Sequence, residues 1–111
     1  MKLIYLACPY SADTIKKMKA RTLAATKKAA ELSIEGYNVF SPLTHSDPIA
    51  DHLPEELRKS QEFWVSRDLQ ILNFCAEMHV LMLDGWEDST GVNHELEYAE
   101  SRGIPIVYHT G

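Results

Sequence analysis

The segment DSTGVNHELEYA, residues 88–99, carries an acid, Glu95, early in an expected helix. Val92 and Ala99 belong to the apolar line of that helix, and Glu95 lies about 60° from the first and about 40° from the second, so it flanks the buried face. The free N–H groups of a helix N-terminus also favour an anion. Taken alone, this pattern favours a partly exposed glutamate that benefits from the helix dipole or pairs with Arg102; the alternative is an acid that faces a ligand.

A second acid interrupts an apolar helical line more clearly. In the segment FWVSRDLQILNFC, the positions on that line are Trp64, Asp68, Ile71, Leu72 and Cys75. A carboxylate therefore stands where a core residue is expected, and burying it without a partner would cost several kcal/mol. Either Arg67 or a backbone N–H satisfies Asp68, or the side chain faces a pocket as a candidate functional acid. Arg67 is a poor partner because adjacent helix positions do not face each other, and both alternatives stay open.

Other polar groups offer weaker candidates. One proline-rich segment contains His45, Asp47, Asp51 and His52. Their spacing matches no metal-ligand frame, so no metal is expected, and His45 and Asp47 are instead expected at the rim of a pocket. The turn ACPYS lacks the glycines of a phosphate-binding loop or a dinucleotide fingerprint, which argues against ATP and NAD, and no cofactor is expected. Nothing places a base beside Cys8, so a thiol nucleophile is not favoured.

The composition restricts the class of protein. With 111 residues, 45% of them hydrophobic, the chain is expected to be one domain, residues 1–111, with a substantial core. A net charge of −5 argues against a nucleic-acid polymer as partner. Six of the eleven basic residues, Arg21 among them, lie in the segment from Lys16 to Lys28, which favours a solvated helix face over the alternative, a phosphate-binding patch. Neither a membrane span nor a signal peptide is recognisable, so a cytoplasmic protein without a membrane partner is expected.

Apolar periodicity predicts strands and helices in alternation. The expected strands are residues 2–7, 37–41, 78–84 and 104–109, and the expected helices span about residues 11–35, 54–75 and 89–102. Gly36 and Gly103 end the first and third helices, and three prolines predict a loop at residues 42–54. This β-α-β-α-β-α-β order predicts an α/β fold, an open and mostly parallel sheet of four to five strands with helices on both faces.

Ligands bind such sheets at the carboxyl ends of the strands, where the strand order switches. The loops there are ACPYS, SPLTHSDP and DGWEDSTG. Asp68 and Glu95 can line one pocket only if the first and third strands are neighbours, which predicts the strand order 2-1-3-4.

Three motifs carry a resemblance to a known family: KLIYLACPYS, WVSRDLQIL and DSTGVNHELEYA. At this spacing and in this order they resemble the nucleoside 2-deoxyribosyltransferase-like superfamily, which includes the transferases and the 2'-deoxynucleoside 5'-phosphate N-hydrolases. The match is best with a small branch of domains of unknown function, and it covers nearly the whole chain. The resemblance implies a flavodoxin-like or Rossmann-like three-layer sandwich, a nucleoside or nucleotide pocket, and cleavage of the N-glycosidic bond.

The resemblance also implies roles for individual residues. Glu95 matches the family's nucleophilic glutamate, and Asp68 the aspartate that assists the leaving base. Tyr5 matches the strand tyrosine that orients the glutamate, so the resemblance implies that Tyr5 lies within hydrogen-bond reach of Glu95. Ser89 matches the serine that the hydrolases place on the 5'-phosphate, and Asp88 falls near a base-binding acid of the transferases. The residues expected to bind the substrate are Cys8, Pro9, Ser11, His45, Trp64, Asp88, Ser89 and Gly91.

The chemistry of the family needs two carboxylates with different protonation states. One stabilises or attacks the anomeric carbon as oxocarbenium character develops, and the other protonates the departing base. The helix N-terminus near Glu95 predicts an ionised nucleophile. The apolar line that Asp68 shares with Trp64 predicts the higher pKa for Asp68, which suits the acid.

The favoured hypothesis is therefore an N-glycosidase that acts on a nucleoside 5'-monophosphate or a nucleoside. The transferases of the family have a longer C-terminal segment, whereas this chain ends at Gly111, which favours hydrolysis over transfer. The alternatives are a nucleoside deoxyribosyltransferase and a catalytically silent module that senses nucleotides. Phe63, Trp64 and Phe74, on more than one helix face, predict a homodimer or a higher symmetric oligomer.

Overall fold

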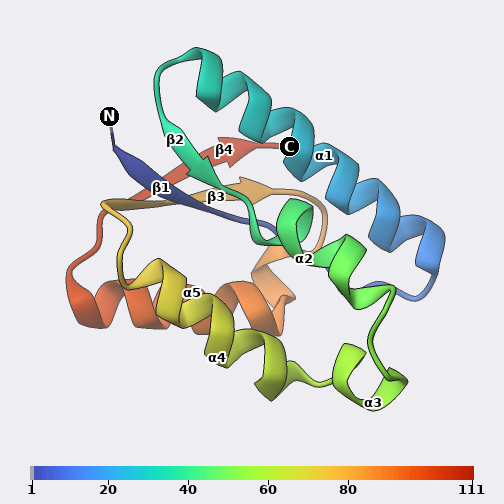
Figure 1. The fold of residues 1–111 in the computed structure, drawn as a ribbon. Helices are drawn as coiled ribbons and strands as arrows, with labels where there is room; N and C mark the ends of the chain where they lie inside the picture. Colours follow the sequence, from blue (N-terminus) through green and yellow to red (C-terminus); the bar gives the residue numbers. More distant parts are fainter. Residues whose placement is uncertain (1) are drawn as a thin grey trace.

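A parallel sheet forms the centre of the protein, whose computed structural model describes residues 2–111 (Figure 1). Its strands within that range are β1 (Leu3–Ala7), β2 (Asn38–Phe40), β3 (Glu77–Met82) and β4 (Ile106–Thr110). Their order is β2-β1-β3-β4, and the three pairings between them are parallel. The α/β fold and the strand order 2-1-3-4 that the sequence predicted are thereby confirmed.

Helices connect the strands and run back along the faces of the sheet. They are α1 (Ile15–Ile34), α2 (Pro42–Ala50), α3 (Glu55–Arg58), α4 (Gln61–Leu72), the 3-10 helix η1 (Trp86–Asp88) and α5 (Thr90–Arg102). Within residues 2–111, no helix combines the length and the apolar character that crossing a membrane requires. A helix that follows a parallel strand begins at the carboxyl end of the sheet, so several helix N-termini meet at that edge.

Two apolar clusters form the core, one on each face of the sheet. Successive side chains of a strand point to opposite faces. Tyr5 therefore packs with Leu72 of α4 and Val92 of α5, whereas Ile4 packs with Leu32 of α1. Helix α1 covers one face and helices α4 and α5 cover the other, which gives the expected three layers (Figure 1).

The loop predicted at residues 42–54 is wrong over most of its length, because α2 occupies this segment. Pro42 lies in the first turn of α2, where the missing N–H needs no partner and the fixed φ suits a helix. Pro48 lies inside the helix and removes one internal hydrogen bond. These prolines are why the sequence reads as a loop, although the first of them is well placed to start a helix.

The single helix predicted at residues 54–75 is also wrong, because the chain forms α3 and α4 there. The break lies at Ser60, whose side chain caps α4 by accepting a hydrogen bond from the N–H of Phe63 at 3.1 Å. The indole Nε1 of Trp64 donates to the carbonyl of Arg58 at 2.9 Å, which ties α3 to the first turn of α4. Helix α4 therefore starts beside the carboxyl ends of the strands, with Trp64 in its first turns.

Helix α1 begins four residues later than the predicted start near residue 11. Thr14 caps it, because its side chain accepts a hydrogen bond from the N–H of Lys17 at 3.1 Å. The segment between β1 and α1 thus stays non-helical, and its side chains are available to line a site.

The packing of α4 on the sheet is testable with a matched pair of leucines. We expect Leu72→Ala to lower the free energy of unfolding by about 3 kcal/mol, because the side chain is fully buried and its loss leaves a void. Leu23→Ala is the control, since Leu23 is 55% exposed, and we expect a change below about 0.5 kcal/mol. Urea unfolding followed by circular dichroism measures both, and equal losses would contradict the described core.

Candidate active site

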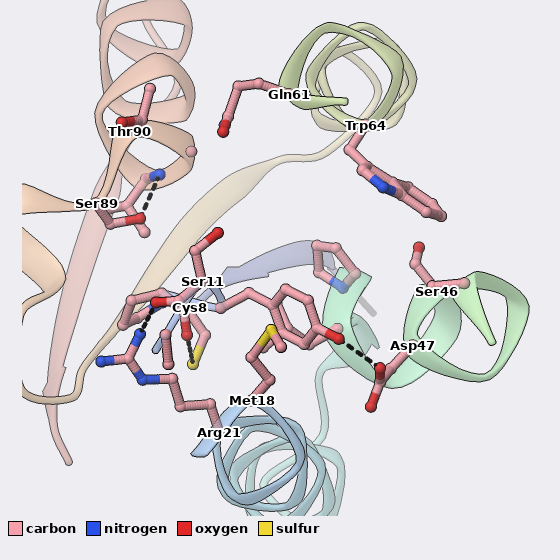
Figure 2. Close-up of a pocket in the computed structure, with 18 of the residues that line it drawn as sticks. Cys8, Ser11, Met18, Arg21, Ser46, Asp47, Gln61, Trp64, Ser89 and Thr90 are labelled. Carbon is pink, nitrogen blue, oxygen red and sulfur yellow. Dashed lines mark hydrogen bonds between the residues drawn. The ribbon is translucent and has the colours of Figure 1, made fainter. Parts of the chain in front are cut away.

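A cavity of about 830 Å³ opens at the carboxyl ends of β1 and β3. Its wall is formed by the loop after β1 and by parts of α1, α2, α3, α4 and α5 (Figure 2). The residues named from the sequence that line it are Cys8, Pro9, Ser11, Trp64, Asp68, Asp88, Ser89, Gly91 and Glu95. The prediction that Asp68 and Glu95 share one pocket is therefore confirmed, and the volume is that of a small-molecule site.

Of the residues expected to bind the substrate, His45 is the one that does not line this cavity. Its ring packs against Phe40, with 5.4 Å between the ring centroids, and it borders a separate hollow of about 240 Å³. The expectation failed because the segment is helical: His45 and Asp47 lie about 200° apart around α2. Of the two, Asp47 lines the main cavity.

Glu95 is buried between α5 and the sheet, with 7% of its surface exposed. The hydroxyl of Tyr5, which is fully buried on β1, donates a hydrogen bond to Oε2 of Glu95. Burial and the nearby Glu95 carboxylate raise the pKa of Tyr5 well above its usual range, so Tyr5 keeps its proton and acts as a donor. The predicted contact between Tyr5 and Glu95 is thus confirmed.

The predicted order of the two acid pKa values is reversed in the structure. Burial raises the pKa of Glu95 from 4.5 to about 8, although the hydrogen bond from Tyr5 works in the opposite direction. Burial raises the pKa of Asp68 to about 6. The helix dipole was overrated because α5 is capped at Ser89, so Glu95 lies in the second turn, beyond the short range over which the dipole acts.

Asp68 faces the cavity rather than a neighbour on its own helix. Arg67 is engaged elsewhere: its Nη1 donates to the carbonyl of Phe63 at 3.0 Å, and its guanidinium lies 3.6 Å from the centroid of the Phe63 ring. Of the two alternatives that the sequence left open, the pocket is therefore the right one. Asp68 and Glu95 are also close enough for the charge of Asp68 to raise the pKa of Glu95.

The N-terminus of α5 forms another part of the wall. Ser89 caps this helix, since its Oγ accepts a hydrogen bond from the N–H of Val92 at 3.3 Å (Figure 2). Ser89, Thr90 and Gly91 all line the cavity. Gly85, with φ of 83°, makes the left-handed turn that leads from β3 into η1 and this helix start.

Arg21 was assigned from the sequence to a solvated helix face, and this assignment is wrong because Arg21 lines the cavity. Its guanidinium donates to the carbonyl of Ser11 at 2.6 Å and to the carbonyl of Asp84 at 2.9 Å. It thereby links the loop after β1 to the loop after β3. The signal was its place three residues after Met18, on the line of α1 that faces the cavity.

Sequence comparison assigns the chain to a family. The model of a domain of unknown function, DUF1937, matches residues 2–110. The chain belongs to this family. Together with the structural likeness below, this places it in the nucleoside 2-deoxyribosyltransferase-like superfamily. Among curated proteins, no sequence matches it significantly.

One solved structure that resembles this DUF1937 protein is a 2-deoxyribosyltransferase from the psychrotolerant bacterium Bacillus psychrosaccharolyticus. The two share 25% sequence identity with a TM-score of 0.67, and the match covers 97% of this chain and 72% of the other. The likeness covers nearly the whole of this chain, which agrees with its Rossmann-like fold.

The buried state of Glu95 predicts how stability depends on pH. Because folding raises its pKa from 4.5 to about 8, the folded state binds the proton more tightly, and the resulting stability is lost as pH rises between those values. We expect Glu95→Gln to stabilise the protein by up to about 4 kcal/mol at pH 8 and to have little effect near pH 4.5. Thermal unfolding of both proteins across this range measures the difference. A gain that does not vary with pH would contradict a protonated, buried Glu95.

Proposed function

We propose that this DUF1937 protein cleaves the N-glycosidic bond of a nucleoside 5'-monophosphate or a nucleoside, with Glu95 as the nucleophile. The observation that carries the proposal is that two carboxyl groups, Glu95 and Asp68, line one cavity. The Tyr5 hydroxyl, on β1, donates a hydrogen bond to Glu95. The superfamily and the likeness to a 2-deoxyribosyltransferase support a reaction at a nucleoside glycosidic bond.

The proposed reaction proceeds in two steps. In the first, an ionised Glu95 oxygen attacks the anomeric carbon while the bond to the base nitrogen breaks, and Asp68 gives its proton to the departing base. In the second, Asp68 takes a proton from water, and the hydroxide attacks the anomeric carbon and releases Glu95 as a carboxylate. Tyr5 holds the attacking side chain in place through its hydrogen bond to Oε2.

The 5' end of the substrate is proposed to lie at the start of α5. Ser11, Ser89 and Thr90 lie on the same side of the cavity, opposite Trp64 and Asp47 (Figure 2). Hydroxyl groups and free N–H groups at a helix N-terminus suit a phosphate. Arg21, which donates to the carbonyl of Ser11, adds positive charge beside this side of the cavity.

Hydrolysis and transfer share the first step and differ in what intercepts the glycosyl-enzyme. Chromatography of wild-type protein incubated with ribo- and deoxyribonucleosides and their 5'-monophosphates tests both, because a hydrolase releases free base and free sugar. Addition of a second base distinguishes a transferase, which would form a new nucleoside. Binding without release of base from any member of the panel would contradict the proposed function and leave the silent module.

The role of Glu95 is tested by exchanging its carboxylate for an amide. We expect Glu95→Gln to lower turnover by about three orders of magnitude or more while nucleotide binding persists, because shape remains and the attacking charge is lost. Glu97→Gln is the matched control, since Glu97 is exposed on the same helix. Near-normal base release by Glu95→Gln would remove Glu95 from its role and make Asp88 the next acid to test.

The pH profile follows from the two carboxyl groups. The reaction needs Glu95 ionised and Asp68 protonated, which is the minor of the two singly protonated forms of the pair because Glu95 has the higher pKa. The pair loses its first and second protons near pH 6 and pH 8. We therefore expect a bell-shaped profile of kcat/KM with limbs near these values and a maximum near pH 7. In Asp68→Asn only Glu95 titrates, so activity on substrates with good leaving bases should rise to a plateau. A bell that persists in Asp68→Asn would assign the upper limb to another group.

We also propose a homodimer or a higher symmetric oligomer. Several large apolar side chains are exposed, among them Ile34 at 88% and Phe74 at 78%. Light scattering at micromolar concentration should give a mass of at least twice 12.6 kDa. A mass near 12.6 kDa would contradict this assembly.

A further inference from the structure

A hydrogen-bonded pair that the proposed reaction does not use, Tyr10 and Asp47, forms part of the cavity wall. Tyr10 follows β1 and Asp47 lies in α2, so the pair bridges two elements of the site. The Tyr10 hydroxyl donates to Oδ1 of Asp47 at 2.6 Å, the bond drawn beside Asp47 in Figure 2. Lys19 Nζ lies 3.1 Å from the same oxygen, and it also donates to both carboxylate oxygens of Asp51.

The protonation states of Tyr10 and Asp47 are both fixed. Asp47 is 5% exposed, and burial alone would raise its pKa, but hydrogen bonds from Tyr10 and Lys19 outweigh this effect and lower it below the usual value. Burial, followed by the bond to Asp47, raises the pKa of Tyr10 above its usual range. Asp47 is therefore a carboxylate and Tyr10 a neutral phenol whose proton is committed to Asp47.

This commitment determines what Tyr10 can offer to a ligand. A phenol has one O–H donor and otherwise only acceptor lone pairs. Because Asp47 holds the donor, the Tyr10 oxygen can only accept a hydrogen bond from a molecule in the cavity. An N–H group of a ligand gains a partner there, whereas a carbonyl oxygen would meet an acceptor and lose the hydrogen bond it made in water.

The base of a nucleotide would lie at this end of the cavity, a step that rests on the proposed function. Asp68, the proposed acid for the leaving base, is one helical turn after Trp64 and so lies on the same face of α4. Trp64, Ser46 and Asp47 lie on one side of the cavity, and Ser89 and Thr90 lie on the other (Figure 2). A phosphate near Ser89 and a base near Asp68 therefore direct the base toward the Tyr10–Asp47 pair.

We propose that Tyr10, oriented by Asp47, makes the protein select nucleobases that carry an exocyclic amino group over their keto counterparts. The matched comparisons are adenine over hypoxanthine and cytosine over uracil, in which the exocyclic amino donor becomes a carbonyl acceptor and the adjacent ring nitrogen gains a proton; the proposed contact of Tyr10 is with the exocyclic position. Tyr10 is the specificity-determining residue, since it contacts the base, and Asp47 is a positioning residue, since it fixes the Tyr10 proton. A site built to accept a hydrogen bond rejects the mismatched analogue by roughly 10- to 100-fold.

The test uses the full chain and the 5'-monophosphates of these four bases, with ribose and with deoxyribose. Calorimetry gives Kd, and chromatography of the released base gives kcat/KM. We expect wild-type protein to prefer the amino member of each pair by at least about 10-fold and Tyr10→Phe to reduce this ratio to below about 3-fold. Comparing the ratio between the two proteins cancels the intrinsic difference between the leaving bases.

Asp47→Asn tests the positioning role separately. An amide can donate to the Tyr10 oxygen, which frees the phenol proton to turn toward the ligand, so the amino preference should fall and the keto members should bind more tightly than to wild type. A purely structural Asp47 would instead weaken both members of each pair equally. Asp51→Asn is the matched control, because Asp51 contacts Lys19 and not Tyr10, and its ratio should equal that of wild type. Circular dichroism verifies that each variant is folded.

The outcomes separate this inference from the proposed function. An amino preference that Tyr10→Phe abolishes supports the inference, whether it is seen in base release or, in a protein that releases no base, in Kd alone. If the preference is seen in Kd alone and no base is released, the N-glycosidase proposal fails, whereas the proposed selection of amino bases by Tyr10 is still supported. Equal or keto-favouring ratios in wild-type protein overturn the inference, even if base is released. No binding of any nucleotide overturns both.

Discussion

The site depends on a single constraint, the burial of a carboxyl group between α5 and the sheet. Burying the ionised Glu95 carboxylate away from water costs free energy, and this cost raises the pKa of Glu95 to about 8. The fold meets this cost in two ways: the Tyr5 hydroxyl donates to the carboxyl group, and the group holds its proton at neutral pH. The hydrogen bond requires β1 and α5 to be held at a fixed position relative to each other, so an acid that is costly for the fold also defines where the sheet and the helix meet.

Strand order explains how side chains far apart in the sequence reach that acid. With β1 between β2 and β3, the loops after β1, β2 and β3 open at one edge of the sheet, and the helices that follow start there. Tyr5, Asp47, Asp68 and Glu95 come from four elements and reach the same cavity or its back wall. Each element contributes few side chains, so no local segment contains the site, and the sheet supplies the common frame.

The sequence was most informative where burial repeats with the period of a helix or a strand. That period predicted the strands and helices and singled out Asp68 on an apolar line, and the strand order then followed from the hypothesis that Asp68 and Glu95 share one pocket. The period could not distinguish a proline in the first turn of a helix, such as Pro42, from a proline in a loop. It also could not show that Ser60 caps a new helix. The order of the pKa values of Glu95 and Asp68 could not be predicted from the sequence, because the depth at which Glu95 is buried is a property of tertiary packing. Arg21 appeared solvated because the two carbonyls it binds belong to other loops.

Those two bonds of Arg21 have a consequence for the entropy of recognition. Loops that meet only around a ligand lose their conformational freedom at the moment of binding, which weakens affinity. Here one guanidinium already joins the segments after β1 and β3, so their ordering is completed during folding. These two parts of the cavity wall are therefore held in place before a ligand binds, so the free energy of contact with a ligand is not reduced by the cost of ordering them.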